Sequence, residues 1–539
     1  MPTSQRLLAA AAVLASAALL AGCATPAASD EQHLTFAIEG ANLSAGHMDP
    51  HSSQLDVSAL VGRQVLDSLV AQDLDGSFVP WLAESWEISD DQLTYTFQLR
   101  DDVTFTDGEP FNAESVKANF DHITAEETAS AHAAAMLGAG SAYVDTTVVD
   151  EFTVAVNFST PYAPFLQAAS TSLLGFYSPK VLESSADDLK TGGPDVTIGT
   201  GPFILESYTP DQELEYVANP DYTWGPANAE HTGPSELDAL TIRILPESSV
   251  RTGALTSGEA DVATNLTPNT ISQVGDGYTV NAAEYPGIPY SLHINESYGV
   301  FQDPLVREAF SIGFDIDSAV ESIFFGQFDR AWSVLGPTTP NSYDASLEGS
   351  WPYDADRAGE LLDEAGWTER DAEGYRVKDG VRLSARWIAY TPIPDERAAL
   401  ADVIQSDLKE IGFEIVREAL EPAAYNEQYG PRTYDITDWS FANVDADGLR
   451  SHFHTDGFQN ASTVSDPALD ALLEDAVATS DEEVRTGLYQ EVQQYNAEQH
   501  LMVPLYVPSL LTAYSDSVTG LEWDLYGRPL FVGASVSAG

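Results

Sequence analysis

Segments with strand periodicity and segments with helix periodicity alternate along the chain from residue 34 to residue 507. Leu93 to Leu99 alternates apolar and polar side chains and is rich in aromatic and β-branched residues, which is typical of a β-strand. Ala399 to Ile411 has helical spacing and is followed by Gly412, a common helix stop. The alternation predicts a mixed α/β protein without internal repeats.

The same patterns predict the remaining elements. Further strands are expected at 34–38, 153–158, 240–245, 261–263, 413–416 and 504–507. Further helices are expected at 57–69, 113–123, 251–257, 304–314, 317–325, 356–365, 467–476 and 482–499.

Charge and composition exclude several classes of protein. The 539 residues include 84 Asp and Glu against 23 Lys and Arg, a formal net charge of −61. A chain this acidic would meet nucleic acid with like charge, so we expect no nucleic-acid partner. An apolar fraction of 43% is too high for a disordered acidic tail, and the length predicts at least two lobes.

The N-terminus predicts export and a lipid anchor. Leu7 to Ala21 is an apolar run that is too short for a comfortable membrane span but fits a signal peptide. It ends in Leu20-Ala21-Gly22-Cys23, which resembles the bacterial lipobox, and Cys23 is the single Cys of the chain. We therefore expect a signal peptide at 1–22, lipid attachment at Cys23 and a flexible tether at 23–32. The alternative is a secreted protein with an incidental Cys.

Motifs for catalysis or metal binding are missing or incomplete. We find no nucleophile elbow, phosphate-binding loop, zinc-protease pair or dinucleotide fingerprint. Asn443 to Gly448 resembles the start of a calcium loop, but the twelfth position is His454 rather than an acidic ligand. His452 and His454 are spaced i, i+2 and could share a metal ion on a strand, and His47 and His51 occur elsewhere in the chain. We expect no metal, no cofactor and no enzymatic activity.

A series of short motifs resembles family 5 of the extracytoplasmic solute-binding proteins of ABC importers, the oligopeptide, dipeptide and nickel group. The motifs occur in order from about residue 33 to the C-terminal strand. They are LAESW at 82–86, GTGPF at 199–203, NPDY at 219–222, LTSGEADV at 255–262, VREAF at 306–310, and YD at 353–354 with LLDEAGW at 361–367.

The resemblance implies a two-lobe α/β architecture, the type II periplasmic-binding-protein fold, with an extra subdomain inserted in the first lobe. The expected ranges are 33–62, 190–286 and 508–539 for lobe I, 63–189 for the inserted subdomain and 287–507 for lobe II. In this fold, ligand is enclosed between the lobes as they close.

The resemblance also implies a ligand-binding segment that begins at a Trp in the second lobe, here Trp439. Peptide-binding members usually carry an Asp three positions later, where this chain has Ala442, and Asp445 is the nearest carboxylate. The other candidates come from this segment, from the loop after the first strand and from lobe II. The expected ligand-binding residues are Trp439, Phe441, Asn443, Asp445, Asn42, His47, Asn295 and Trp332.

The function implied is that of a monomeric importer receptor that delivers its ligand to an ABC permease and ATPase complex. Peptide is the leading ligand class, and oligosaccharides, opine-like compounds and metal chelates remain open. An extracytoplasmic hydrolase and a surface adhesion module are the alternatives of other classes. The missing nucleophile motifs argue against the hydrolase, and the absence of repeats or stalks argues against adhesion.

Overall fold

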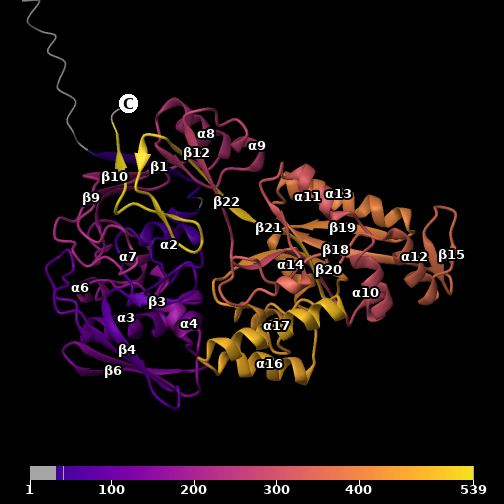
Figure 1. The fold of residues 1–539 in the computed structure, drawn as a ribbon, viewed down its shortest axis with the longest axis horizontal. Helices are drawn as coiled ribbons and strands as arrows, with labels where there is room; N and C mark the ends of the chain where they lie inside the picture. The colour runs from indigo at the N-terminus through magenta and orange to yellow at the C-terminus, as the bar shows by residue number, and fades with distance from the viewer. Residues whose placement is uncertain (1–31, 41, 538–539) are drawn as a thin grey trace, which may run out of the picture.

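A computed structural model describes residues 32–40 and 42–537 (Figure 1). Cys23, the expected signal peptide and most of the expected tether lie outside the described residues. The described residues form two α/β bodies, which confirms the predicted fold class. Among these residues, no helix is long and apolar enough to cross a membrane.

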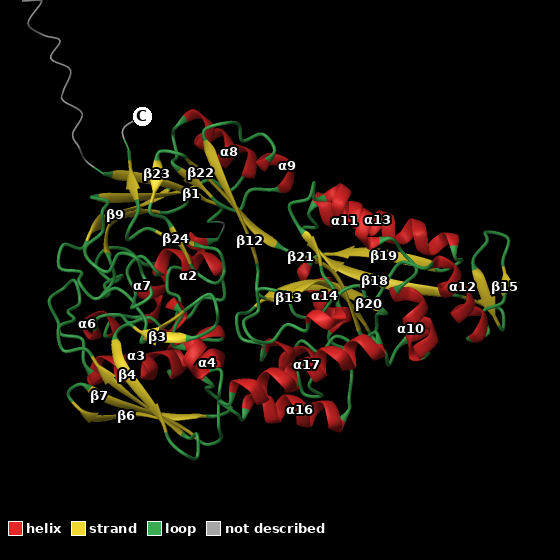
Figure 2. Ribbon diagram, viewed as in Figure 1, coloured by secondary structure: helices red, strands yellow, loops and turns green. Residues whose placement is uncertain are grey.

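The first body is built on a seven-stranded sheet (Figure 2). β1 pairs in parallel with both β10 and β11, and the other pairs are antiparallel. All seven strands fall within the ranges expected for lobe I. In sheet order they are β12 (Tyr278–Glu284), β22 (Ser509–Ser515), β11 (Val262–Ala263), β1 (His33–Ile38), β10 (Ala239–Ile244), β9 (Glu213–Ala218) and β8 (Phe203–Thr209).

A four-stranded antiparallel sheet forms the core of the range expected for the inserted subdomain. Its order is β4 (Ala83–Ile88), β5 (Thr94–Leu99), β7 (Thr153–Phe158) and β6 (Tyr143–Asp150). The helix α3 (Ala113–Thr124) covers it and begins with a capping box between Asn112 and Ser115. Tyr95 and Phe97 meet Phe165 edge-on in its buried core.

The second body contains a six-stranded mixed sheet, and its strands fall within the range expected for lobe II. In order they are β14 (Asp329–Arg330), β21 (Met502–Val507), β13 (Gly287–Ile294), β20 (Ile436–Ala442), β18 (Ser384–Tyr390) and β19 (Glu414–Leu420).

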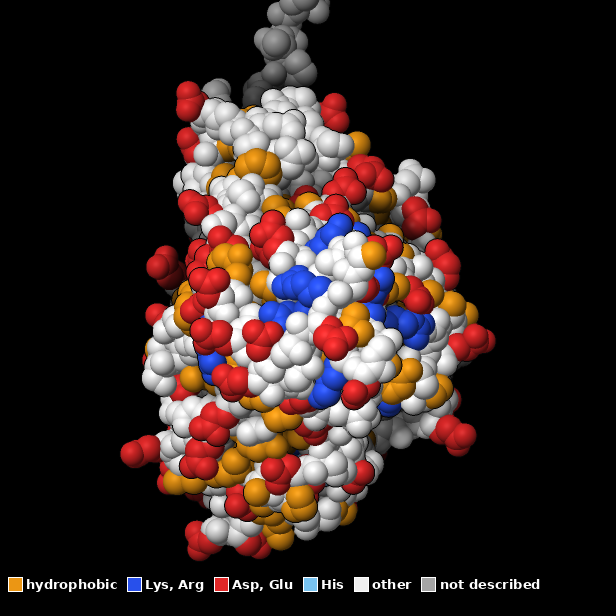
Figure 3. Space-filling model, turned by 90° about the vertical axis from the view of Figure 1, so that its right-hand side faces the viewer, with side chains coloured by type: hydrophobic (Ala, Val, Ile, Leu, Met, Phe, Trp, Pro, Cys, Tyr) orange, Lys and Arg blue, Asp and Glu red, His pale blue; other side chains and the backbone are white. Residues whose placement is uncertain are grey.

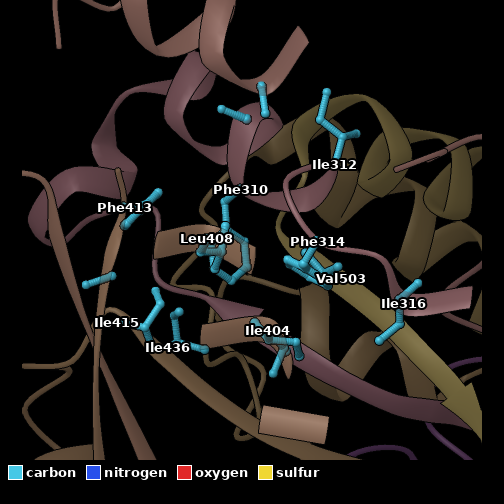
Figure 4. Close-up of a cluster of buried hydrophobic side chains, with 14 of the residues drawn as sticks. Phe310, Ile312, Phe314, Ile316, Ile404, Leu408, Phe413, Ile415, Ile436 and Val503 are labelled. Atoms are coloured by element: carbon cyan, nitrogen blue, oxygen red, sulfur yellow. The ribbon is translucent and has the colours of Figure 1, made fainter. Parts of the chain in front are cut away.

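Helices cover both sides of this sheet. In Figure 2, α11 (Ile316–Ile323) and α13 (Asp395–Glu410) lie along one side, and α16 (Pro467–Val477) and α17 (Glu482–Gln499) lie along the other. Figure 4 shows Phe310 and Leu408 within the buried apolar core of this lobe. Because each helix buries one apolar face against the sheet, the lobe has its own hydrophobic core.

Two short segments join the lobes side by side. The first is Tyr285-Pro286, between β12 and β13, and the second is Pro508, between β21 and β22. The Tyr285 amide donates to the Pro508 carbonyl at 2.8 Å, so the crossings are hydrogen-bonded to each other. Rotation about two such adjacent crossings changes the separation of the lobes without disturbing either core.

Basic side chains gather at the far end of lobe II, near α12 (Ala355–Glu364) (Figure 3). The strands β15 (Glu369–Arg370), β16 (Arg376–Lys378) and β17 (Val381–Arg382) form a small sheet there. Arg382 pairs with three carboxylates, those of Asp371, Glu373 and Glu414. The surrounding acidic residues therefore neutralise much of this basic cluster.

Candidate functional site

A cavity of about 780 Å³ lies at the junction of the two lobes. Tyr285 and Pro508 of the crossings line it, together with residues of both lobes and the inserted subdomain. Lobe II contributes Arg397, Ser440, Phe441, Ala442 and Val444. The volume is in the range of small-molecule sites, and the position between two hinged lobes suits enclosure of a ligand.

Most of the lobe II residues that line the cavity lie at or just after the end of β20. A Cβ built on Gly287 would lie 2.5 Å from both the Asn443 nitrogen and the Phe441 oxygen, and Gly287 has a φ of 95°. Glycine at this position therefore lets the first residue of β13 pack directly against the end of β20. This close approach places Phe441, Ala442 and Val444 beside the crossing segments.

Three guanidinium groups line the cavity, and they differ in their partners. Arg528 pairs with Asp56 and Asp524. Arg63 donates to two backbone carbonyls and to the Ser68 hydroxyl, and it lies over the ring of Trp81 at 4.9 Å. Arg63 forms no ion pair within 4.0 Å among the described residues, and the carboxylates of Asp67 and Asp524 act on its charge from further away.

Arg397 is the only charged residue that lobe II contributes to the described cavity wall. Its Nε donates to the Tyr506 hydroxyl at 3.2 Å, and its guanidinium lies 4.3 Å from the centre of the Tyr290 ring. No other hydrogen bond from this guanidinium and no ion pair is found in the described part of the chain. Its two terminal nitrogens are therefore able to bind an anionic group in the cavity.

Asp67 is a fully buried carboxyl group on the lobe I side of the cavity. Its Oδ2 accepts from the Thr200 hydroxyl at 2.9 Å and from Trp224 Nε1 at 3.1 Å. Its Oδ1 has no hydrogen-bond partner within the described residues. Burial is the main cause that raises the pKa of Asp67 to about 7.

Other buried polar atoms of the cavity wall are also left without partners. Within the described residues these are Gln72 Oε1, Trp81 Nε1 and Arg528 Nε. Buried polar atoms in native proteins are nearly always hydrogen-bonded, so unpartnered ones beside a cavity indicate positions where a ligand or ordered water bonds.

Of the eight residues proposed from the sequence, Phe441 alone lines this cavity in the described structure. Trp439 lies further back along β20, stacked on His293 with 3.9 Å between ring centres. Its Nε1 donates to His452 Nε2 at 3.1 Å. Trp439 therefore supports the wall from behind, within a buried aromatic group.

The polar candidates on the same segment bond within the protein. Asn443 Oδ1 accepts from the Asp445 amide at 3.1 Å. Asp445 accepts from Arg485 through both carboxylate oxygens, at 2.6 and 2.9 Å, and Asp447 pairs with Arg450 at 2.6 Å. Asp445 and Asp447 belong to the segment that resembles a calcium loop, and both of their carboxylates are therefore paired with arginines.

The four remaining candidates lie away from the cavity wall. Asn42 is exposed beside a short helical turn, and His47 Nδ1 lies 3.3 Å from the Ser53 hydroxyl. Asn295 is buried and donates to the carbonyls of Arg432 and Tyr434, each at 3.0 Å. Trp332 lies beneath the Arg330 guanidinium at 4.7 Å.

The paired histidines at 452 and 454 do not share a strand. Residues Gly448–Phe453 form the helix α15, and His454 follows it. Burial lowers the pKa of His452 to about 4, so this ring is neutral at physiological pH. Among the described residues, no group of three or more His, Cys, Asp or Glu side chains is arranged to hold a metal ion.

Comparisons with known proteins agree with this architecture. The model of the bacterial extracellular solute-binding proteins, family 5 Middle, matches residues 77–460. The chain is 30% identical over 456 residues to the probable D,D-dipeptide-binding periplasmic protein DdpA of Escherichia coli, a match that covers 82% of each chain.

Two solved structures share the fold over almost the whole chain. NikA from Brucella suis, in complex with Fe(III)-EDTA, superposes with a TM-score of 0.81 at 24% identity, covering 94% of this chain and 100% of that one. A nickel ABC transporter protein from Bacillus halodurans superposes with a TM-score of 0.73 at 28% identity and the same coverage.

Proposed function

The chain belongs to family 5 of the bacterial extracellular solute-binding proteins, the substrate-binding components of ABC importers, and from this premise we propose that it captures a peptide between its two lobes. The observation that carries the proposal is the cavity at the junction of the lobes. A ligand that contacts both walls stabilises the closed form by its higher affinity for that form. The closed receptor then delivers the ligand to the membrane permease and its ATPase.

We propose that the moving bodies follow the ranges expected from the sequence. Lobe I comprises 33–62, 190–286 and 508–539, with 63–189 inserted, and lobe II comprises 287–507. The inserted subdomain meets lobe II directly, since the Ala163 amide donates to the Val477 carbonyl at 3.0 Å and the Ser480 amide donates to Gln92 Oε1 at 2.8 Å. These contacts lie away from the crossings and are suited to hold the lobes together around a ligand.

The chemistry of the cavity wall supports a peptide. Side-chain amides such as Gln54 and Gln167 supply donors and acceptors for peptide bonds, and Phe441 and Trp81 supply apolar surface. Arg397 and Asp67 supply opposite charges from opposite lobes, which suits a zwitterion. These amides, aromatic rings and charged groups could also bind oligosaccharides, opine-like compounds or metal chelates, which are the alternative ligands.

A binding screen tests this function. We expect a dipeptide or short peptide to bind one-to-one in calorimetry, to raise the melting temperature and to reduce the radius of gyration in small-angle scattering. We expect no turnover of the peptide during prolonged incubation. Binding confined to oligosaccharides or chelates would contradict the peptide assignment, and catalytic cleavage would favour the hydrolase alternative.

We further propose that a lipid on Cys23 anchors the receptor to the outer face of the cytoplasmic membrane or within the periplasm. The sequence Leu20-Ala21-Gly22-Cys23 supports this proposal. We expect Cys23→Ser to move the protein from the membrane fraction to the soluble extracytoplasmic fraction in cell fractionation. Its ligand affinity should stay within about twofold of the wild type because the cavity is unaltered. Unchanged membrane association of the Ser variant would contradict the lipid anchor.

A further inference from the structure

The carboxyl group of Asp67 is held in an unfavourable environment. It is fully buried and lines the cavity, and its Oδ1 has no hydrogen-bond partner among the described residues. Burying an ionisable group with incomplete hydrogen bonding is costly. A group of this kind beside a cavity is a candidate for ligand binding, because a ligand can supply the missing partner.

The neighbours of Asp67 do not supply that partner. Arg63 supplies a positive charge that acts on Asp67, but its guanidinium bonds to backbone carbonyls and to Ser68 rather than to the carboxylate. Burial raises the pKa of Tyr222 well above its usual value, so this phenol stays neutral. Thr200 and Trp224 both bond to Oδ2 and leave Oδ1 free.

Several other carboxylates in or near the cavity wall are already paired with arginines. Asp56 and Asp524 both pair with Arg528. Asp445 pairs with Arg485, and position 442, where peptide-binding relatives were expected to carry Asp, is Ala. Asp67 is therefore the fully buried carboxyl of the described cavity wall that retains an oxygen for a ligand.

We propose that Asp67 binds a cationic group of the transported solute, an ammonium or a guanidinium, at the lobe I end of the cavity. This role rests on the proposed receptor function and adds a specificity-determining residue to it. A cationic group would complete the hydrogen bonding of Oδ1 and provide a directly bonded counter-charge, since the Arg63 guanidinium bonds elsewhere.

The proposal has a consequence for pH. Because a cation binds the ionised carboxylate, a ligand that binds Asp67 must displace the proton that the unliganded carboxyl holds below about pH 7. Affinity should therefore rise by up to tenfold per pH unit between pH 5 and pH 7, with release of close to one proton per ligand at pH 5.5. Calorimetry of the wild type in two buffers of different ionisation enthalpy measures this proton release without any variant.

The decisive comparison uses alanyl-phenylalanine and its N-acetyl derivative, which lacks the ammonium, with agmatine as a cationic solute that is not a peptide. We expect the wild type at pH 7 to bind alanyl-phenylalanine, which carries an ammonium group, at least tenfold more tightly than the acetylated peptide, which lacks it. We expect Asp67→Asn to abolish that preference while keeping or raising the melting temperature, because the amide removes a buried charge. Asp261→Asn is the matched control, since Asp261 is a half-buried carboxyl of lobe I with a raised pKa that lies off the cavity wall.

The outcomes separate this proposal from the peptide assignment. Tight, Asp67-dependent binding of agmatine without peptide binding would support the cation site and contradict the peptide assignment. Peptide binding with equal affinity for the acetylated form, no proton release at pH 5.5, or an unchanged preference in Asp67→Asn would overturn the cation site. Failure of the wild type to bind either cationic probe would also overturn it.

Discussion

Replacing Asp445 by Asn should lower the free energy of unfolding by about 3 kcal/mol, because it leaves a buried guanidinium without its counter-charge. Asp445 holds Arg485 through two short hydrogen bonds, of 2.6 and 2.9 Å. The two side chains are only 9% and 18% exposed, so solvent screens the pair weakly. The guanidinium of Arg485 also lies 5.1 Å from the ring centre of Tyr489, a residue of the hydrophobic core of the lobe.

Urea unfolding of the two variants at one pH measures this effect. Asp402→Asn is the control, since Asp402 pairs with Arg417 on the surface and its side chain is 70% exposed. We expect the control to change stability by less than about 0.5 kcal/mol. An Asp445→Asn protein of unchanged stability but with at least tenfold weaker ligand binding would instead support the ligand role expected from the sequence.

Most helices and strands could be predicted because their signals are local. The expected helices at 482–499 and 467–476 match α17 and α16 to within one residue. The helix expected at 57–69 ends at Gly62, as the helix α2 (Asp56–Gly62). The carbonyls of Gln64 and Val65 accept from the amides of Phe203 and Gly201, so tertiary pairing with the GTGPF turn replaces the last helical turns.

The site was less predictable because its wall is assembled from distant segments. Phe441 was found through the motif that begins at Trp439, but the same motif gave no sign that Trp439 would stack on His293, which lies on a neighbouring strand. No motif in the sequence marks Arg63, Asp67 or Arg397 as a ligand-binding residue. Their shared cavity follows from the packing of the lobes, and their unusual property, a lack of hydrogen-bond or charge partners, is visible only in three dimensions.

The second large effect is expected at Arg397, where substitution by Met should weaken binding of an anionic ligand by about 30- to 100-fold. That range corresponds to about 2 to 3 kcal/mol, a typical loss for a charge-assisted hydrogen bond that is shielded from water. The effect should be larger in binding than in stability, because no described carboxylate lies within 4.0 Å of Arg397. The buried Asp438, on which Arg397 acts from further away, keeps its hydrogen bonds from Tyr290 and Trp387 after the substitution. Met preserves much of the packing of the side chain on Tyr290.

Arg432→Met is a closely matched control. Arg432 also lies over a tyrosine, 4.0 Å from the ring centre of Tyr429, and donates to the hydroxyl of Tyr434 at 3.3 Å. It too has no carboxylate within 4.0 Å among the described residues, but it does not line the cavity. A loss of affinity in Arg397→Met alone would therefore identify contact with the ligand rather than a general loss of positive charge or of stacking.

The identity of the ligand group is tested with alanyl-phenylalanine and its C-terminal amide, which lacks the carboxylate. Wild-type protein should prefer the free acid, and Arg397→Met should bind both forms equally, in calorimetry at one salt concentration. Because Arg397 is the only charge on the lobe II side of the described cavity, losing it should also reduce the compaction seen in small-angle scattering at equal ligand concentration. A preference for the free acid that survives in Arg397→Met would place the anion site elsewhere, with Arg63 as the next group to test.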